Sequence, residues 1–446
     1  MLPGMRIAIV LSGLMLGCGG DKPGADGDAD SDSDSDTDSD TETDTDTGTD
    51  SDSDSDSDTD TESESDTDTC VPPDNDGDGY DALGCGGEDC DDTDADVNPA
   101  AIENEYWTID VADATVGTIS ASSVALDSSG SVHAAYNDDD TDDLRYATNA
   151  TGVWVLETPA EAGATGYGAS IAIDADDGVH VAFHDRGPRD AVHGWKDAGG
   201  WDFETIASTS DTGWDPSIAV DDGGVVHVAY FDASGSDLYY ATDRAGAWLT
   251  TPLDQDGFAG YQPCLALDPD GNVHVVSLFE LKGDGDVRYA TDASGAWVAS
   301  NIDATGDTGY GGSIAVAPDG TLHVTYQDIS NGDLRHASND GAGWDLDLVD
   351  DAETTGQSSS VAVDADGVVH VAYHDYFNAD LRYATNRGGA WTASTVDSDG
   401  LTGVLPAIAV DDVVHIVYFD ESTGAVEHAW ITRPDGADSD CDEVPW

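Results

Sequence analysis

A repeat of about 47 residues constrains this chain more than any other feature of its sequence. One unit, residues 217–248, reads SIAVDDGGVVHVAYFDASGSDLYYATDRAGAW, and variants of it recur from Ser123 almost to the C-terminus. A histidine and a tryptophan mark the period seven times each, at His133, His180, His227, His274, His323, His370 and His415, and at Trp107, Trp154, Trp201, Trp248, Trp297, Trp344 and Trp391. A period in this range is typical of repeat architectures.

Each unit contains four short runs rich in β-branched and aromatic residues. In the unit above they cover 217–220, 225–231, 237–242 and 247–251, and turns of Asp, Gly and Ser separate them. This chemistry predicts β-hairpins, and four short antiparallel strands per unit are typical of a propeller blade. Because no window has a sustained 3.6-residue apolar period, we expect an all-β fold with almost no helix.

The ends of the repeat array predict how the ring closes. The last unit, 407–430, ends before its tryptophan strand, whereas the strand around Trp107 has no unit before it and precedes Trp154 by one period. An open array would expose strand edges at both ends. We therefore predict a seven-bladed β-propeller over residues 105–432, in which the N-terminal strand completes the last blade.

Two segments of the repeat are similar to known propeller families. Leu265–Val275 (LALDPDGNVHV) and Val361–Val371 (VAVDADGVVHV) resemble NHL repeats and the Asp-box turns of sialidase-like propellers. A histidine inside the blade and a tryptophan on a later strand also resemble WD repeats. These resemblances imply the fold and leave the activity open, because propellers host unrelated functions.

The composition and the N-terminus indicate an exported protein. The chain has 94 Asp+Glu against 13 Lys+Arg, which disfavours nucleic acid and anionic lipid surfaces as partners. The apolar run Ile7–Leu16 is too short to span a bilayer, so residues 1–17 are predicted to be a signal peptide. Leu14–Cys18 (LMLGC) resembles a bacterial lipobox, which implies lipidation of Cys18 and attachment to the outer membrane or cell surface of a Gram-negative bacterium. A plain secretory signal is the alternative.

Residues 18–69 are predicted to be a disordered stalk. Almost every second residue after Asp26 is acidic, and the rest are nearly all Ser and Thr, so there is no apolar surface to bury. The segment resembles the Ser-Asp stalks of bacterial surface adhesins.

Residues 70–104 are predicted to form a small calcium-binding module. Alternating carboxylates and well-placed glycines in DNDGDGY resemble the first half of an EF-hand loop, although Cys85 stands where the bidentate Glu is usual. The module resembles the MopE-type Asp-rich motif of bacterial surface proteins and, more distantly, thrombospondin type 3 repeats. All-oxygen ligands favour Ca²⁺; a chance acidic run is the alternative. The candidate ligands are Asp74, Asp76, Asp78, the carbonyl of Tyr80, Glu88, Asp89, Asp91, Asp92 and Asp94.

The cysteines fit the same picture of an exported chain. Cys85 and Cys90 are close enough in sequence to staple the calcium loop, and Cys264 stands where other blades carry Ser, so it is expected to be a buried thiol. That leaves Cys70 to pair with Cys441. The tail, residues 433–446, resembles the closing half of the Asp-rich motif and is expected to pack on residues 70–104.

Most of the repeated polar residues are expected to be structural. Seven histidines spread around a ring cannot converge on one reacting atom, so each is predicted to bond a nearby Ser or backbone group. The tryptophans are predicted to be packing anchors. Four arginines share one repeat position and are expected to form a wide ring: Arg145, Arg288, Arg335 and Arg382. In the second blade, five charged or titratable residues depart from the repeat: His184, Arg186, Arg189, His193 and Lys196.

The best candidates for ligand contact are aromatic residues on the glycine-rich loops that begin four consecutive blades: Tyr167, Trp214, Tyr261 and Tyr310. The link between blades crosses the ligand-binding face in propellers generally, and aromatic rings there suit stacking on sugars. Packing in the gap between blades is the alternative explanation.

We therefore predict a monomeric cell-surface lipoprotein that contacts the membrane only through its lipid anchor. Its propeller is expected to act as a lectin-like or adhesin-like module for a glycan or a surface protein, and not as an enzyme. A sialidase-like glycoside hydrolase is the alternative function, and a structural envelope or interaction scaffold is the third.

Overall fold

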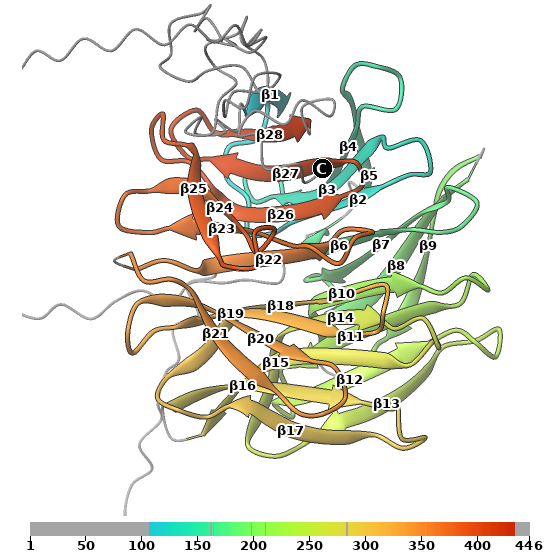
Figure 1. Cartoon of the computed structure of the whole chain (residues 1–446). Coiled ribbons are helices and arrows are strands. Elements are labelled where there is room, and N and C mark those ends of the chain that lie inside the picture. The colour runs from blue at the N-terminus through green and yellow to red at the C-terminus, as the bar shows by residue number, and fades with distance from the viewer. Residues whose placement is uncertain are drawn as a thin grey trace, which may run out of the picture. The chain divides into compact units, whose positions relative to one another are not determined.

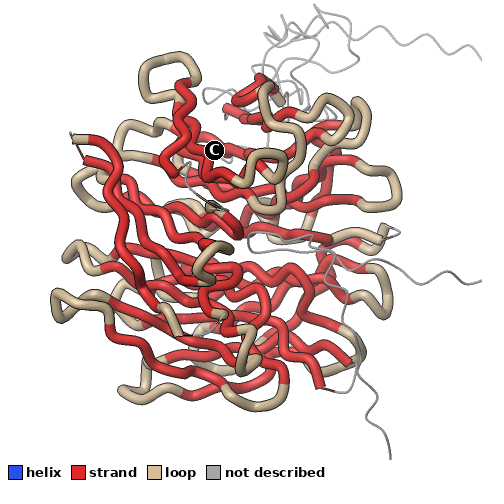
Figure 2. Tube along the Cα trace, turned by 180° about the vertical axis from the view of Figure 1, so that it is seen from behind, coloured by secondary structure: helices blue, strands red, loops and turns tan. Residues whose placement is uncertain are grey.

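The computed structural model describes residues 107–432, except 161, 162, 164, 198, 210, 282, 283 and 353. All regular secondary structure in this part of the chain is β-strand, as Figures 1 and 2 show, so the all-β prediction is confirmed. No helix in these residues is long and apolar enough to cross a membrane.

The strands form seven antiparallel four-stranded sheets, numbered here as blades in chain order. Blade 1 contains β2 (Ser122–Leu126), β3 (Val132–Asp138), β4 (Asp143–Thr148) and β5 (Val155–Ala160); blade 2 contains β6 (Tyr167–Ile173), β7 (Val179–Asp185), β8 (Asp190–Asp197) and β9 (Gly200–Ala207); blade 3 contains β10 (Thr212–Val220), β11 (Val226–Asp232), β12 (Asp237–Thr242) and β13 (Leu249–Asp254). Blade 4 contains β14 (Phe258–Leu267), β15 (Val273–Leu281), β16 (Asp284–Thr291) and β17 (Val298–Asp303); blade 5 contains β18 (Thr308–Val316), β19 (Leu322–Asp328), β20 (Asp333–Asn339) and β21 (Asp345–Asp350); blade 6 contains β22 (Gln357–Val363), β23 (Val369–Asp375), β24 (Asp380–Thr385) and β25 (Thr392–Asp397). Blade 7 contains β26 (Val404–Val410), β27 (Val413–Asp420), β28 (Ala425–Thr432) and β1 (Thr108–Asp113).

The N-terminal strand closes the ring, as the repeat predicted. β1 pairs with β28 in antiparallel register, with Thr108 opposite Trp430 and Ile109 opposite Ala429, so it supplies the missing fourth strand of blade 7. The first strands of consecutive blades contact one another, and β26 contacts β2. Figure 1 shows β1 beside β28. The prediction of a seven-bladed propeller closed by an N-terminal strand is confirmed.

In six of the seven blades an aspartate builds the turn that ends the first strand; blade 5 has Ala317 there. In blade 2 the Asp174 Oδ1 atom accepts hydrogen bonds from the backbone N–H groups of Asp176 and Gly178, at 2.9 and 2.7 Å. This side-chain closure of a tight turn is the reason that Asp is favoured there. We call the end of the ring that carries these turns (127–131, 174–178 and their equivalents) the turn end. The opposite end, which carries the links between blades (207–212, 254–258 and their equivalents), is the linker end.

The core lies between neighbouring blades. Val181 and Phe183 in β7 pack with Tyr146 of blade 1, whereas Ala182 between them packs with Val228 of blade 3. Alternate side chains of a strand point to opposite faces of its sheet, and here both faces are covered. This is why second strands such as β3, β19 and β23 are buried along their whole length. Burial of each Val or Phe side chain contributes about 1.5–3 kcal/mol.

Serines link the first strands around a central channel of about 160 Å³. The Ser217 Oγ atom accepts the backbone N–H of Leu265 in the next blade at 2.9 Å, and Ser360 does the same for Ile408 at 3.2 Å. Cys264 occupies this position in blade 4 as a buried thiol, so its predicted burial is confirmed.

Several predictions concern residues 1–106 and 433–446, which lie outside the described residues. They include the signal peptide, the lipidation of Cys18, the stalk, the calcium ligands of residues 70–104, the tail and the disulfides Cys85–Cys90 and Cys70–Cys441. All of these remain predictions.

Candidate ligand-binding site

The seven repeated histidines, six of them buried and His180 half-buried, form a structural network at the turn end. In blade 1 the His133 Nδ1 atom lies 2.6 Å from the Tyr146 hydroxyl, and its Nε2 atom lies 3.2 Å from the carboxylate of the turn residue Asp127. In five blades the histidine thus joins the first turn of its blade to the third strand. The predicted structural role fits this geometry, but the expected partners were wrong: the contacts go to Asp and Tyr side chains instead of Ser or backbone groups.

Three blades replace the tyrosine of this network by a second histidine. The pairs His180–His193, His323–His336 and His415–His428 each have a 3.0 Å separation between Nδ1 and Nε2. Burial lowers the pKa of His193 to about 4, with a further lowering from the neighbouring His180. His193 is therefore neutral at physiological pH, and each pair forms a hydrogen-bonding contact within its blade.

The repeated arginines are engaged in ion pairs at the interfaces between blades. Arg145 Nη2 lies 2.7 Å from Asp138, and Arg335 Nε lies 3.2 Å from Asp328. Arg288 pairs with Asp254, and Arg382 Nη2 lies 3.1 Å from Asp350. Because each guanidinium is held by a carboxylate, these arginines do not gather at one point.

The four predicted aromatic residues lie in the first strands of blades 2 to 5, at the linker end. Tyr167 and Tyr310 are buried, with 3% and 8% of their surface exposed, whereas Trp214 and Tyr261 are half-buried. The Tyr167 and Trp214 rings meet edge to face at 5.5 Å, and Tyr261 meets Phe231 in the same way at 5.7 Å. Only Trp214 and Tyr261 of the four keep substantial surface for contact with a ligand.

Three of the five departures of blade 2 lie around two of these aromatic rings, whereas His193 and Lys196 contact other residues. We call this group the blade 2 cluster, which consists of Tyr167, His184, Arg186, Arg189, Asp211 and Trp214. The Arg186 guanidinium lies over the Tyr167 ring, 3.8 Å from its centroid. The Trp214 Nε1–H donates to Asp211 at 2.7 Å, and Arg189 Nη1 lies 3.4 Å from the same carboxylate. Two arginines therefore flank an aromatic surface.

The arginines and Asp211 supply the charge of the cluster. The His184 ring lies 4.4 Å from the Trp214 ring, and burial lowers the pKa of His184 to about 4, so this histidine is neutral at pH 7. Burial raises the pKa of Tyr167, whose hydroxyl has no hydrogen-bond partner among the described residues. The sequence singled out His184, Arg186 and Arg189, but their approach to Tyr167 follows from the strand register, which sets Tyr167 opposite His184.

Two polar residues missed by the sequence reasoning lie just beyond the aromatic positions. Asp215 and Gln262 have φ angles of 48° and 52° and lie within register shifts of β10 and β14. Both side chains are 3% exposed, and neither oxygen of Asp215 has a hydrogen-bond partner among the described residues. Burial raises the pKa of Asp215 to about 7. The signal that could have found them is a polar residue where blades 2 and 5 carry Gly168 and Gly311.

The described part of the chain contains no group of three or more His, Cys, Asp or Glu side chains arranged to hold a metal ion. The predicted calcium site is on residues outside this part, so it is untouched by this observation.

No protein-family model and no curated protein matches the chain. Among solved structures, a catalytically inactive virginiamycin B lyase from Staphylococcus aureus is similar at 12% identity, with 73% of this chain and 99% of the lyase covered and a TM-score of 0.51. An ulvan lyase is similar at 12% identity, with coverage of 68% and 90% and a TM-score of 0.48. A lectin of Aleuria aurantia is similar at 16% identity, with coverage of 60% and 97% and a TM-score of 0.42. At 12% identity, the likeness to the virginiamycin B lyase supports the propeller fold alone.

Proposed function

We propose that the propeller is a carbohydrate-binding module that takes an acidic glycan at the blade 2 cluster. One observation carries the proposal: the side chains of Arg186 and Arg189, 35% and 63% exposed, stand beside the Trp214 and Tyr167 rings. The chain has 13 Lys+Arg against 94 Asp+Glu, so two arginines on one aromatic surface are a local exception to its charge.

The chemistry of the cluster suits a sugar that bears a carboxylate. A guanidinium has five N–H donors in a planar fork that fits a carboxylate, and the single contact from Arg189 to Asp211 leaves donors available. The Asp211 carboxylate also holds the Trp214 indole by its N–H, which limits the freedom of the ring before a ligand arrives. A half-buried indole offers a flat apolar face to the C–H face of a pyranose.

Binding fits this cluster better than catalysis. A tyrosine nucleophile needs an adjacent base and access to the substrate, whereas Tyr167 is 3% exposed and Arg186 covers its ring. The glycoside hydrolase and the structural scaffold remain the less favoured alternatives.

The proposal extends to how the module is presented. Lipidation of Cys18 would tether a monomeric chain to the outer membrane or cell surface, and the acidic stalk would hold the propeller away from it. Calcium binding by residues 70–104 would stabilise that module, and Ca²⁺ should then raise the melting temperature of the module by mass action.

A glycan array tests the function directly. The purified chain should bind oligosaccharides that carry uronic or sialic acids more strongly than their neutral counterparts, and binding should weaken with added salt. Arg189→Ala should lower the affinity about 10- to 100-fold, because a hydrogen bond to a charged group is worth about 1.5–3 kcal/mol.

Arg244→Ala is the matched control. Arg244 lies at the turn end, where its side chain is 61% exposed and 3.6 Å from Asp221, close to the values for Arg189. It removes the same charge from the opposite end of the ring, so affinity should not change. Equal losses in both variants, or no preference for acidic sugars, would reject the proposed site.

A further inference from the structure

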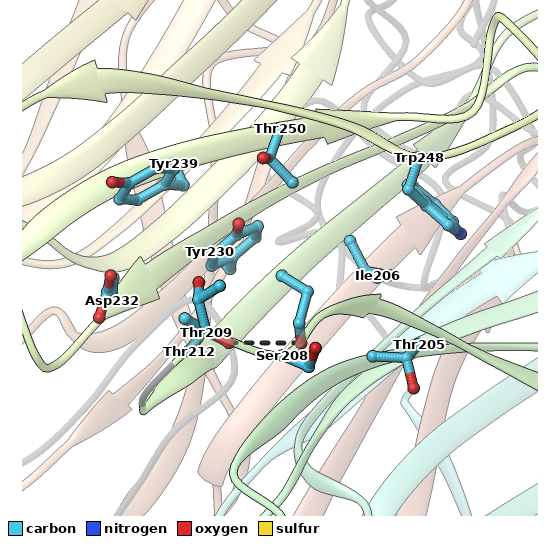
Figure 3. Close-up of a pocket in the computed structure, with 11 residues that line it drawn as sticks. Thr205, Ile206, Ser208, Thr209, Thr212, Tyr230, Asp232, Tyr239, Trp248 and Thr250 are labelled. Carbon is cyan, nitrogen blue, oxygen red and sulfur yellow. Dashed lines mark hydrogen bonds between the residues drawn. The ribbon is translucent and has the colours of Figure 1, made fainter.

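The interface between blades 2 and 3 contains a cavity of about 370 Å³. Its lining comes from the end of β9, the linker that follows, and strands β10 to β13. Figure 3 shows Ile206 and Ser208 on the blade 2 side, and Tyr230 and Tyr239 on blade 3. The volume lies within the range of small-molecule sites in proteins.

At this interface two positions depart from the residues that four other interfaces carry. The last residue of the outer strand is an aspartate at five interfaces, at Asp113, Asp254, Asp303, Asp350 and Asp397. The equivalent residue here is Ala207, which has no carboxylate to fill the space. The third strand carries arginine at Arg145, Arg288, Arg335 and Arg382, and here it carries Tyr239.

The interface between blades 4 and 5 shows what normally fills this space. There the Tyr326 hydroxyl donates to the Asp303 carboxylate at 3.0 Å, and Arg335 pairs with Asp328 at 3.2 Å. Tyr230 is the equivalent of Tyr326, but the carboxylate that would accept its hydroxyl proton is missing. The tyrosine hydroxyl is therefore a donor that lines the cavity without its usual acceptor.

The remaining lining is rich in neutral hydroxyl groups. Five serine and threonine side chains line the cavity, together with one carboxylate and no cationic group: Thr205, Ser208, Thr209, Thr212, Thr250 and Asp232. Burial raises the pKa of Tyr230, with contributions from Tyr239 and Asp232, so its hydroxyl stays protonated. The Tyr230 and Tyr239 rings stack at 5.7 Å with a 9° angle between their planes, which holds both in place.

We infer that this cavity binds a neutral monosaccharide, or the neutral terminal residue of a glycan. Hydroxyl groups both donate and accept, so they match the vicinal hydroxyls of a pyranose, and the Asp232 carboxylate accepts from two of them. An acidic sugar would meet Asp232 without any compensating cation. The cavity shares no residue with the blade 2 cluster, so this inference does not depend on the function proposed for that cluster.

Saturation-transfer NMR with free glucose, galactose, mannose and fucose at millimolar concentration tests the inference on the native chain. At least one of these pyranoses should receive saturation. The double variant Ala207→Asp with Tyr239→Arg introduces the residues found at four other interfaces, so it should fill the cavity while keeping the melting temperature at or above that of the native chain. Its affinity for the same pyranose should fall at least about tenfold.

A pair of single substitutions separates binding from folding. Tyr230→Phe removes a hydroxyl that has no carboxylate partner, so it should weaken pyranose binding and leave the melting temperature unchanged. Tyr326→Phe removes a hydroxyl bonded to Asp303, so it should lower the melting temperature and leave pyranose binding unchanged.

Two results would overturn the inference: no saturation transfer to any of the four pyranoses, or equal transfer in the native chain and the filled double variant. Glucuronic acid, titrated in parallel against Arg189→Ala, reports on the blade 2 cluster separately. Loss of one signal with retention of the other shows which of the two sites fails.

Discussion

The two ends of the propeller differ in how many of their buried polar groups have hydrogen-bond partners. At the turn end, His370 is fully buried, and both of its nitrogens are used, by the Tyr383 hydroxyl at 2.6 Å and by Asp364 at 3.3 Å. Four residues further along the same strand, at the linker end, His374 is also buried, but its Nε2 atom has no partner among the described residues.

The contrast extends around the ring. The linker end carries further buried polar atoms without partners, on Tyr167, His184, Asp215, Gln262 and Gln357. The turn end has fewer such atoms, and one of them, His227 Nε2, still lies 3.5 Å from Asp221. Buried polar groups usually have partners, and unpaired ones cost free energy. We interpret the turn end as the part of the repeat that stabilises the blade, and the linker end as the part that is free to vary for a ligand.

The same substitution at both ends of one strand tests most directly whether the two ends of the propeller differ in their contribution to stability. His370→Gln leaves Asp364 and Tyr383 without a shared partner and should lower the free energy of unfolding by about 3–5 kcal/mol, as removal of one member of a buried pair does. His374→Gln removes no hydrogen bond at Nε2 and should cost about 1 kcal/mol or less. Denaturant unfolding of the two variants measures both values, and equal losses would contradict the contrast.

Asp215 offers a second test, with a sign that depends on pH. Burial raises its pKa from 3.8 to about 7, so above pH 3.8 the unfolded carboxyl ionises while the folded one stays protonated. The native chain therefore loses stability as the pH rises, until the folded carboxyl ionises near pH 7.

Asp215→Asn removes this loss, and Asn tolerates the positive φ of this position. Its stabilisation should be small at pH 3.8 and grow to about 4 kcal/mol at pH 7. Melting temperatures across this range give the curve. A constant difference between the variant and the native chain would show that the carboxyl is not buried in an unpaired state.

The smallest expected effect concerns the serine ring around the channel. Cys264→Ser restores the residue found in the neighbouring blades, where the Ser217 and Ser313 Oγ atoms accept a backbone N–H of the next blade at 2.9 and 3.2 Å. A hydroxyl accepts this bond better than a thiol, so we expect a gain of about 0.5–1 kcal/mol. A clear loss of stability would show that the larger sulfur is needed for packing at this position.

Much of the fold could be predicted because the same pattern of strands and turns recurs in seven repeat units. Strand alternation, Asp-Gly turns and the unmatched Trp107 strand together specified the blades and their closure. The partners of the histidines could not be predicted in the same way: Asp127 and Tyr146 are six and thirteen residues from His133 and meet it only after three strands pair.

The sites were harder to predict because they arise where the repeat fails. The sequence drew attention to His184, Arg186 and Arg189 as added charge, but not to Ala207, where a repeated aspartate is absent. A missing carboxylate produces no recognisable sequence motif. Its effect, the cavity between blades 2 and 3, can be seen only once the two blades are packed together.

The central claim is that a ligand binds at the linker end of blade 2, whereas the turn end stabilises the blade. Hydrogen–deuterium exchange of the purified chain, with and without the acidic glycan selected by the array, tests it most directly. We expect slower exchange in residues 184–189 and 211–215 when the glycan is bound, and no change in the turns at 174–178 and 221–225. Slower exchange confined to those turns, or spread evenly over all seven blades, would contradict the account.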